Sequence, residues 1–177
     1  MVMTEHSDDK NEHVKNVYAH FGLAMYFAQV LEHGLANAMM SAQLLPQRAG
    51  RPVEKKEWEA EFDAFMNEQY QQTLGRLIRA LKNSTSVPSS LEGLLAEALE
   101  RRNYLTHHYF RERAEAFMSW KGREQMIEEL QGAQELFDLA DSRLTAVEKQ
   151  LREKYGLTDE RLRPWEEKYF KSLDRDI

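Results

Sequence analysis

Apolar residues recur at alternating intervals of four and three along most of the chain, which predicts helices rather than strands. In the first such stretch, about residues 12–45, one face carries Val17, Phe21, Ala24, Ala28, Leu31, Leu35, Ala38, Ala42 and Leu45. Alanine recurs along this face and Gly34 lies beside it, so a neighbouring helix can approach closely. That neighbour could belong to the same chain or to a second copy in a dimer.

Further helical segments follow, separated by two polar stretches that contain proline, 46–56 and 83–90. The second expected helix is 54–82, and the third begins at Ser89, which forms a capping box with Glu92. The fourth covers about 120–155, with Gly156 as its C-terminal cap, and a short amphipathic segment follows at about 159–172. The pattern predicts an all-α fold, an antiparallel four-helix bundle with a short additional C-terminal helix. Residues 1–177 are expected to form a single domain, with a flexible N-terminal tail at 1–11, a bundle core at 12–155 and a C-terminal extension at 156–177.

Composition narrows the class of protein. The 177 residues suit one domain, and the absence of cysteine excludes disulfides and thiolate metal sites. The acidic, polar N-terminus does not resemble a signal peptide, and the most apolar run, 21–31, is too short to span a bilayer. We therefore expect a cytoplasmic protein without a membrane partner.

Motifs for metal or nucleotide cofactors are missing from the sequence. No histidine follows an acidic residue by three positions, as carboxylate-bridged metal pairs in bundles require, and there is no glycine-rich phosphate loop. We therefore expect neither a metal site nor a cofactor. His13, His20 and His33 are expected on helix surfaces, solvated or locally hydrogen-bonded.

Arg102 interrupts the apolar face of the third predicted helix. At about 100° per residue, Arg102 and Tyr109 point within about 20° of the direction shared by Leu91, Leu95 and Ala98. A guanidinium there must be paired and hydrogen-bonded, either in a structural ion pair or at an interface.

The charge around Arg102 differs from that of the remaining chain. Residues 101–123 contain six Lys/Arg and two Glu, a net charge of +4, whereas the other residues have 18 Lys/Arg and 28 Asp/Glu, a net of −10. A local basic segment on an acidic protein suits a small anion site. The overall charge of −6 argues against broad binding to nucleic acid, and we expect no DNA partner.

The segment "RNYLTHHY", residues 102–109, resembles the R-x4-6-H motif of HEPN-domain proteins. The resemblance implies a helical bundle that acts as a metal-independent endoribonuclease, in a toxin or phage-defence system. It implies Arg102 and His107 as catalytic residues, with Asn103 and His108 in support. In the R-x4-H-x-Y form, which is similar to HepT-type toxins, Tyr109 would be a regulatory position that a nucleotidyltransferase-type antitoxin modifies, accessible from the same groove as His107. The favoured alternative is an aromatic side chain packed in the apolar seam beside Leu105.

The residue types suit RNA cleavage through the 2′-hydroxyl. The imidazole of His107 could remove or return a proton, and Arg102 could stabilise charge on the phosphorus. Asn103 and His107, four residues apart, share a helix face, so the amide could orient the imidazole.

The five-residue separation of Arg102 and His107 places them about 140° apart on a regular helix. A working site therefore needs a distorted turn or two chains, and the resemblance implies a homodimer. The alternative is a non-catalytic bundle protein that binds a protein partner or RNA through the same basic groove.

Overall fold

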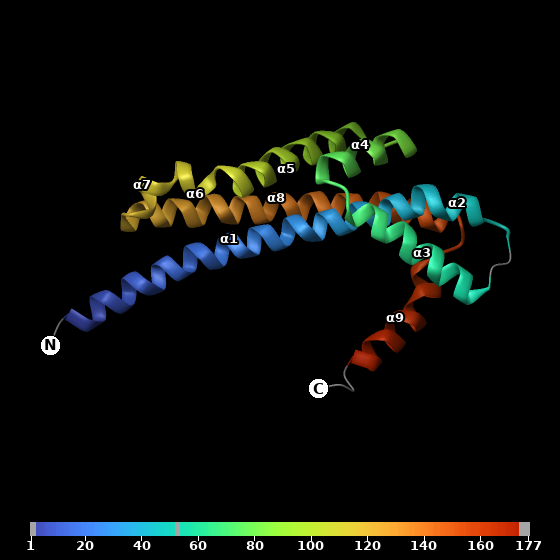
Figure 1. The fold of residues 1–177 in the computed structure, drawn as a ribbon, viewed down its shortest axis with the longest axis horizontal. Helices are drawn as coiled ribbons and strands as arrows, with labels where there is room; N and C mark the ends of the chain where they lie inside the picture. The colour runs from blue at the N-terminus through green and yellow to red at the C-terminus, as the bar shows by residue number, and fades with distance from the viewer. Residues whose placement is uncertain (1–2, 52–53, 174–177) are drawn as a thin grey trace.

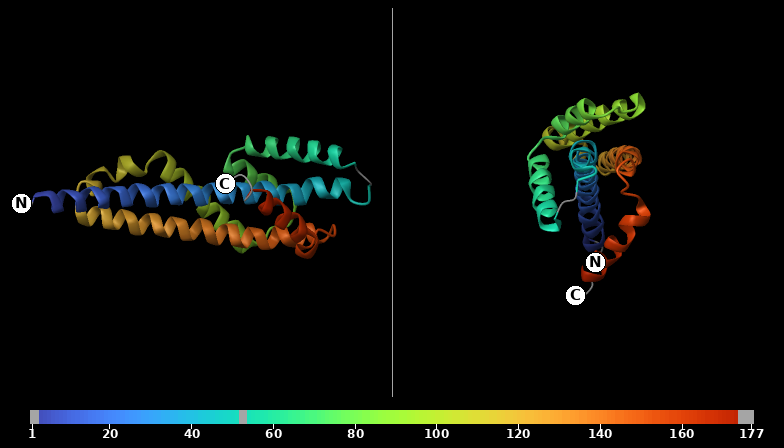
Figure 2. Two further views of the ribbon diagram at one scale, coloured as in Figure 1. Left: turned by 90° about the horizontal axis from the view of Figure 1, so that it is seen from below. Right: turned by 90° about the vertical axis from the view of Figure 1, so that its right-hand side faces the viewer.

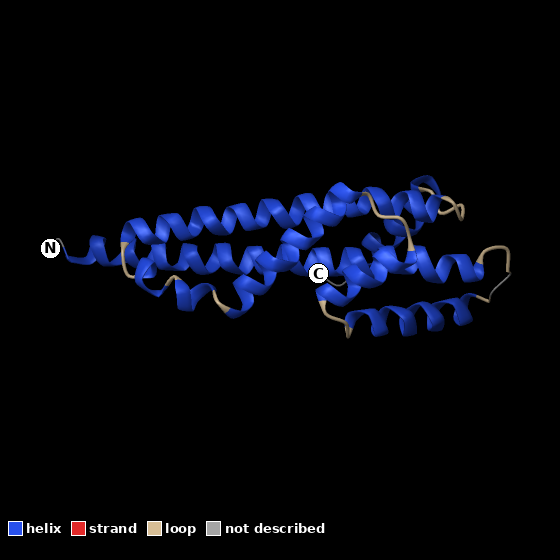
Figure 3. Cartoon of the chain, turned by 90° about the horizontal axis from the view of Figure 1, so that it is seen from above, coloured by secondary structure: helices blue, strands red, loops and turns tan. Residues whose placement is uncertain are grey.

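The computed structural model describes residues 3–51 and 54–173, and these ranges contain only helices and the turns between them (Figures 1 and 3). The helices are α1 (Met3–Met39), the π-helical turn η1 (Met40–Leu44), α2 (Leu45–Arg48), α3 (Lys55–Tyr70), α4 (Leu74–Ser84), α5 (Ser89–His107), α6 (Tyr109–Glu112), α7 (Ala114–Phe117), α8 (Trp120–Glu153) and α9 (Asp159–Leu173). The predicted all-α helical bundle with an additional C-terminal helix is confirmed.

Helices α1 and α8 pack along each other for most of their length and form the centre of the bundle (Figure 2). The contacts rise in order along both helices: Arg123 bonds to His13, Gln134 to His20, and Glu148 to Ser41 of η1, which continues α1. The two longest helices are therefore parallel, whereas the expected antiparallel arrangement would run the first and fourth helices in opposite directions.

The parallel pair arises because the second expected helix is divided. The segment 54–82 forms α3 and α4, with a break at residues 71–73. Tyr70 lies against His33 and Glu61 against Arg48, so α3 runs antiparallel to α1. The break at 71–73 then reverses the direction of the chain once more than expected. As a result, α5 and α8 each run opposite to the direction that an undivided helix at 54–82 would give them.

The predicted apolar faces form the core. Its fully buried side chains include Leu31 and Leu35 of α1, Leu95 of α5, and Phe137 and Leu144 of α8. A methyl group at Gly34 would lie 2.5 Å from the Asp141 Oδ1 and 3.3 Å from the Leu144 side chain. The close approach expected at this glycine is therefore made by α8 of the same chain.

Several helix ends differ from the expected ones. Helix α1 begins at Met3, so residues 3–11 of the expected tail are helical, and residues 1–2 lie outside the described ranges. The expected capping box is wrong, because Ser89 is already the first helical residue and the N-cap, Pro88, has no side-chain bond. After α8, Gly156 adopts a φ of 78°, which confirms its role as the C-terminal cap of this helix.

Helix α9 extends away from the bundle after the Gly156 turn (Figures 1 and 2). Its first residue, Asp159, forms ion pairs with Lys149 and Arg152 of α8. Beyond this base, Trp165, Tyr169 and Phe170 are exposed. Of the described helices, none is both long and apolar enough to cross a membrane.

Candidate functional site

Arg102 lies at the edge of the core and forms an ion pair within the chain. Its Nη2 donates to the Glu32 Oε1 at 2.9 Å, and both side chains are about one quarter exposed, at 25% and 26%. Glu32 belongs to α1, 70 positions earlier in the sequence. The requirement that this guanidinium be paired is confirmed, and the partner is a carboxylate of the neighbouring helix.

A pocket of about 320 Å³ lies beside this ion pair, between α5 and the start of α4. It is lined by Thr73, Leu74, Gly75, Leu99, Arg102, Asn103 and His107. The α4 wall exists because of the break at residues 71–73. Thr73 caps α4 by accepting a hydrogen bond from the Arg76 amide.

The two principal candidate residues therefore border one pocket of a single chain. Arg102 and His107 both line it, although five residues of regular helix separate them. The helix ends at His107, and His108 has a φ of −129°, outside the helical range. One chain therefore brings both residues to the border of this pocket, while the irregular backbone begins only after His107.

Asn103 contacts a different partner from the one expected. Its Oδ1 accepts a hydrogen bond of 3.3 Å from the Arg102 Nη1. Among the described residues, His107 has no hydrogen bond to Asn103, so the expected orientation of the imidazole by this amide is wrong. Asn103 instead helps to hold the guanidinium that Glu32 binds from the other side.

His107 and His108 are both exposed and adjacent, with ring centroids 6.2 Å apart. The His108 Nδ1 lies 2.9 Å from the Arg111 Nη2. His108 is not among the residues that line the pocket, whereas His107 is. His107 is therefore the histidine that a ligand in this pocket can meet.

Tyr109 does not share this access, so the access expected from the HepT resemblance is wrong and the packed alternative is the one observed. The side chain is 1% exposed, and its hydroxyl donates a 3.0 Å hydrogen bond to the carbonyl oxygen of Met126 in α8. Burial, together with the nearby Glu129 carboxylate, raises the pKa of the Tyr109 phenol well above its usual value. The tyrosine is a core residue, so its hydroxyl is not available to a modifying enzyme.

Two other arginines between residues 101 and 123 are bound elsewhere and do not line the pocket. Arg113 pairs with Glu129 at 2.8 Å, and this hydrogen-bonded carboxylate raises the pKa of the guanidinium. Arg123 is 3% exposed and donates to the His13 Nδ1 at 3.2 Å. The positive charge that reaches the pocket is that of Arg102.

The expected surface location of His13 is wrong, because this histidine is buried against Arg123 and Trp120 of α8. His13 is 7% exposed and its ring stacks on Trp120 with centroids 3.8 Å apart. The contact joins the start of α8 to the first third of α1. Sequence reasoning missed it because the pairing residue, Arg123, lies 110 positions away.

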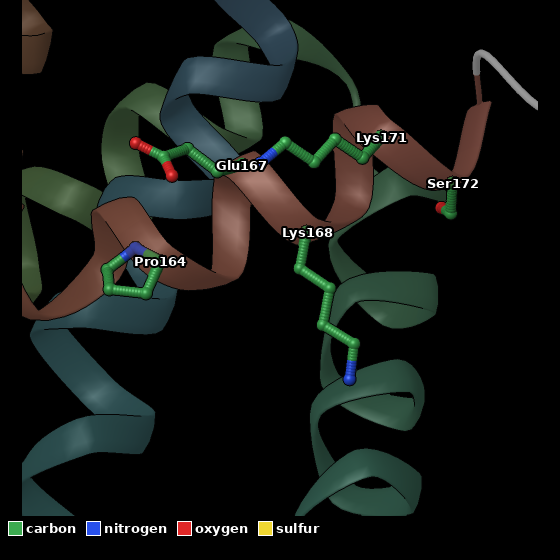
Figure 4. A pocket seen from close by; sticks show the side chains of 5 residues that line it. All are labelled: Pro164, Glu167, Lys168, Lys171 and Ser172. Carbon is green, nitrogen blue, oxygen red and sulfur yellow. The ribbon is translucent and has the colours of Figure 1, made fainter.

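Two further features bear on what the site could hold. Within residues 3–51 and 54–173, no three His, Asp or Glu side chains gather closely enough to bind a metal ion. A second hollow, formed by Pro164, Glu167, Lys168, Lys171 and Ser172, lies entirely on α9 and is a shallow surface feature (Figure 4). The pocket beside Arg102 is therefore the one to which the motif residues contribute.

Comparisons of the chain with protein-family models, with curated proteins and with solved structures find no match. The HEPN resemblance accordingly rests on the motif at residues 102–109 and on the helical-bundle architecture.

Proposed function

We propose that the protein is a HEPN-type, metal-independent endoribonuclease whose active site is the pocket beside Arg102. The observation that carries the proposal is that Arg102, Asn103 and His107 line one pocket of about 320 Å³. These residues supply a permanent cation, a polar amide and an imidazole that can accept and return a proton.

The chemistry assigns a separate task to each side chain. The neutral His107 imidazole accepts the proton of a ribose 2′-hydroxyl, and the 2′-oxygen forms a bond to the adjacent phosphorus. The bond from phosphorus to the 5′-oxygen breaks, and this leaving oxygen takes a proton from the imidazolium. The products are a 2′,3′-cyclic phosphate and a free 5′-hydroxyl.

Arg102 stabilises the negative charge that grows on the non-bridging phosphate oxygens during this step. Glu32 and Asn103 hold its guanidinium from two sides, which fixes the cation at the edge of the pocket. DNA lacks the 2′-hydroxyl and is expected to be inert.

The test is cleavage of end-labelled RNA in the presence of EDTA, with the wild type beside His107→Ala and His108→Ala. We expect cleavage by the wild type, loss of at least about a hundredfold in rate for His107→Ala, and little change for His108→Ala. A cyclic phosphate terminus on the product would identify the reaction. Equal activity of wild type and His107→Ala would refute the assignment.

The second candidate is a non-catalytic bundle protein that binds a partner or RNA at the same surface. The Arg102–Glu32 ion pair favours it, because this contact satisfies the guanidinium without any ligand. Under this hypothesis the protein retains RNA or partner binding but no preparation cleaves RNA, with or without EDTA.

The toxin or phage-defence setting, the homodimer and the nucleotidyltransferase-type antitoxin remain predictions from the resemblance. Modification of Tyr109 is not part of the proposal, since the hydroxyl is buried against Met126.

A further inference from the structure

Helix α9 exposes large aromatic side chains that the ribonuclease proposal does not use. Trp165, Tyr169 and Phe170 are 65%, 61% and 62% exposed. At about 100° per residue, Tyr169 points within about 20° of Leu162, and Trp165 and Phe170 flank this line. Together these four residues form the apolar stripe of α9.

The opposite side of α9 is polar. Pro164, Glu167 and Lys171 point about 140° to 180° away from Leu162 on an ideal helix, and they line the shallow hollow of Figure 4. The helix is therefore amphipathic. Of its apolar stripe, Leu162 is partly buried, whereas the three aromatic side chains are exposed. Exposed apolar surface of this kind on a soluble domain marks an interaction site.

The apolar stripe continues directly into a groove of about 770 Å³, the base groove. This groove lies between the start of α3 and the connection from α8 to α9, and Leu162 belongs to both features. Its apolar walls include Trp58, Phe62 and Tyr155, and its rim includes Arg51 and Arg161.

The direction of α9 is held by its base. The Asp159 carboxylate is bound by both Lys149 and Arg152, and the Arg152 Nη1 also donates to the Leu157 carbonyl oxygen at 2.6 Å. The stripe is consequently presented outward on an anchored helix, which reduces the entropy lost when a partner binds it.

The charge on α9 separates a protein partner from a membrane. Residues 159–173 contain four acidic and four basic side chains, a net charge of zero. Helices that lie on anionic membranes carry an excess of Lys and Arg on the polar face. In addition, Glu166 points only about 40° from Leu162, which places a carboxylate beside the apolar stripe, where a lipid surface would disfavour it.

We propose that the occupant is a second copy of this chain, with the α9 helices of two protomers packed antiparallel across a two-fold axis. In this arrangement the end of each apolar stripe lies over the base groove of the other protomer. Glu166 of each chain then meets a rim that carries Arg51 and Arg161. A two-fold interface must be self-complementary, and the apolar stripe and base groove of one chain supply both halves.

The available area fits a specific dimer. Full burial of an aromatic side chain removes about 150–250 Å² from water, so the exposed parts of six aromatics supply roughly 600–900 Å². Specific interfaces bury about 1,200–2,000 Å² in total. The walls of two base grooves would contribute the remainder.

Light scattering coupled to size exclusion on the full chain tests the stoichiometry. We expect a dimer for the wild type and a dissociation constant raised at least about tenfold by Trp165→Ala. Leu139→Ala on α8, which is 47% exposed, and Met118→Ala, which is 79% exposed, are matched controls and should leave the dimer unchanged. All these side chains are exposed, so circular dichroism should show the wild-type helix content in each variant.

Cross-linking tests the geometry, and the absence of native cysteine makes single replacements unambiguous. Lys55→Cys places a thiol at the base groove and Ser172→Cys places one near the end of α9. A mixture of the two variants should form a covalent dimer on oxidation that exceeds what either variant forms alone. In the double variant, a fast-migrating cross-linked monomer would show instead that α9 folds onto its own chain, and would overturn the proposal.

Three other results would also overturn it: a monomeric wild type, a dimer that Trp165→Ala leaves intact, and binding of the monomer to phosphatidylserine vesicles through Trp165. The proposal does not depend on ribonuclease activity. Its failure leaves the RNA cleavage assay unaffected, and the reverse also holds.

Discussion

Arg102 lies on the apolar face of α5, at a position where a leucine would be expected. Glu32 stabilises the arginine there by forming an ion pair with its guanidinium. The 2.9 Å contact between them is about one quarter exposed, so each charge keeps part of its hydration. Its contribution to the free energy of unfolding should be intermediate: an exposed ion pair contributes little, whereas breaking a buried pair is costly. The guanidinium can therefore hold the fold and still face the pocket.

Replacement of Arg102 by alanine should lower both stability and function. The Glu32 carboxylate would lose its partner while still partly buried, and we expect a loss of about 1–2 kcal/mol in the free energy of unfolding. RNA cleavage, or RNA binding under the second hypothesis, should fall further than the stability loss explains. Urea unfolding and the labelled-RNA assay would measure the two effects.

Arg101→Ala is the matched control, because Arg101 is the neighbouring arginine and does not line the pocket. Its effects on unfolding and cleavage should both be small. If the two substitutions behave alike, the pocket beside Arg102 is not the functional site.

The buried phenol of Tyr109 should make the protein sensitive to alkaline pH. Its pKa is raised in the folded state, so folding favours the neutral phenol and the unfolded chain ionises first. Stability from this group is fully present below the unfolded pKa of about 10 and falls as the pH rises through and above it.

Tyr109→Phe separates this effect from other alkaline titrations. The variant should lose about 1 kcal/mol at neutral pH, because the bond to the Met126 carbonyl oxygen is removed. Its stability should then decline less steeply than that of the wild type between about pH 9 and about pH 11. Urea unfolding at these two pH values is the measurement, and parallel declines would contradict the assignment.

At the scale of the helices, the short turn from α7 to α8 is tightly constrained. A methyl group on Gly122 would lie 2.1 Å from the Ala116 carbonyl oxygen, which is backbone and cannot move aside easily. Ser119 caps α8 at the same place by accepting a 3.0 Å hydrogen bond from the Gly122 amide. The turn thus fixes how the segment after α5 joins α8.

Gly122→Ala should therefore destabilise the protein by at least about 2 kcal/mol. Gly132→Ala, on the same helix with no atom within 4 Å of the added methyl group, should be neutral or stabilising by up to about 1 kcal/mol. Thermal unfolding of the two variants compares them directly. Similar melting temperatures would mean that the turn adjusts without cost.

The same scale shows what the sequence predicts well. The apolar periodicity predicts α1, α5, α8 and α9, because each has a face that must be buried or a cap that ends it. It does not predict the break at residues 71–73, since those three residues include neither glycine nor proline and the apolar spacing from Tyr70 to Leu74 and Leu77 continues across them. Thr73 is the one local signal, as a good N-cap residue that begins α4.

The candidate site was predictable only in part. Arg102 and His107 could be selected from their residue types and spacing, and the need for a carboxylate partner followed from the direction of Arg102. Glu32 and the α4 wall could not be identified, because they depend on contacts between distant segments and on the unpredicted break. Burial of Tyr109 follows from its direction on the apolar face, which the motif comparison alone does not consider.

At the scale of the whole molecule, α9 is an arm whose base is bound to α8 through the carboxylate of Asp159. Asp159 is bound by Arg152 and Lys149, and these hydrogen bonds lower its pKa to about 2. Because the folded pKa is depressed, the contribution is present above the unfolded value of about 3.9 and is lost as the pH falls through about 2. Near neutral pH the Asp159 carboxylate stays ionised, so a substitution, and not protonation, is the way to test the anchor.

Asp159→Asn should loosen the base of α9 without unfolding the bundle, because the core between α1 and α8 does not involve this side chain. We expect amide hydrogens in the first turn of α9 to exchange about two- to fivefold faster at neutral pH, with unchanged exchange in the α8 core around Phe137. Glu160→Gln is the matched control, since it removes the adjacent acidic charge and leaves the contacts of Asp159 with α8 in place. If both variants accelerate exchange equally, local charge near the helix N-terminus, rather than the anchor to α8, governs how α9 is held.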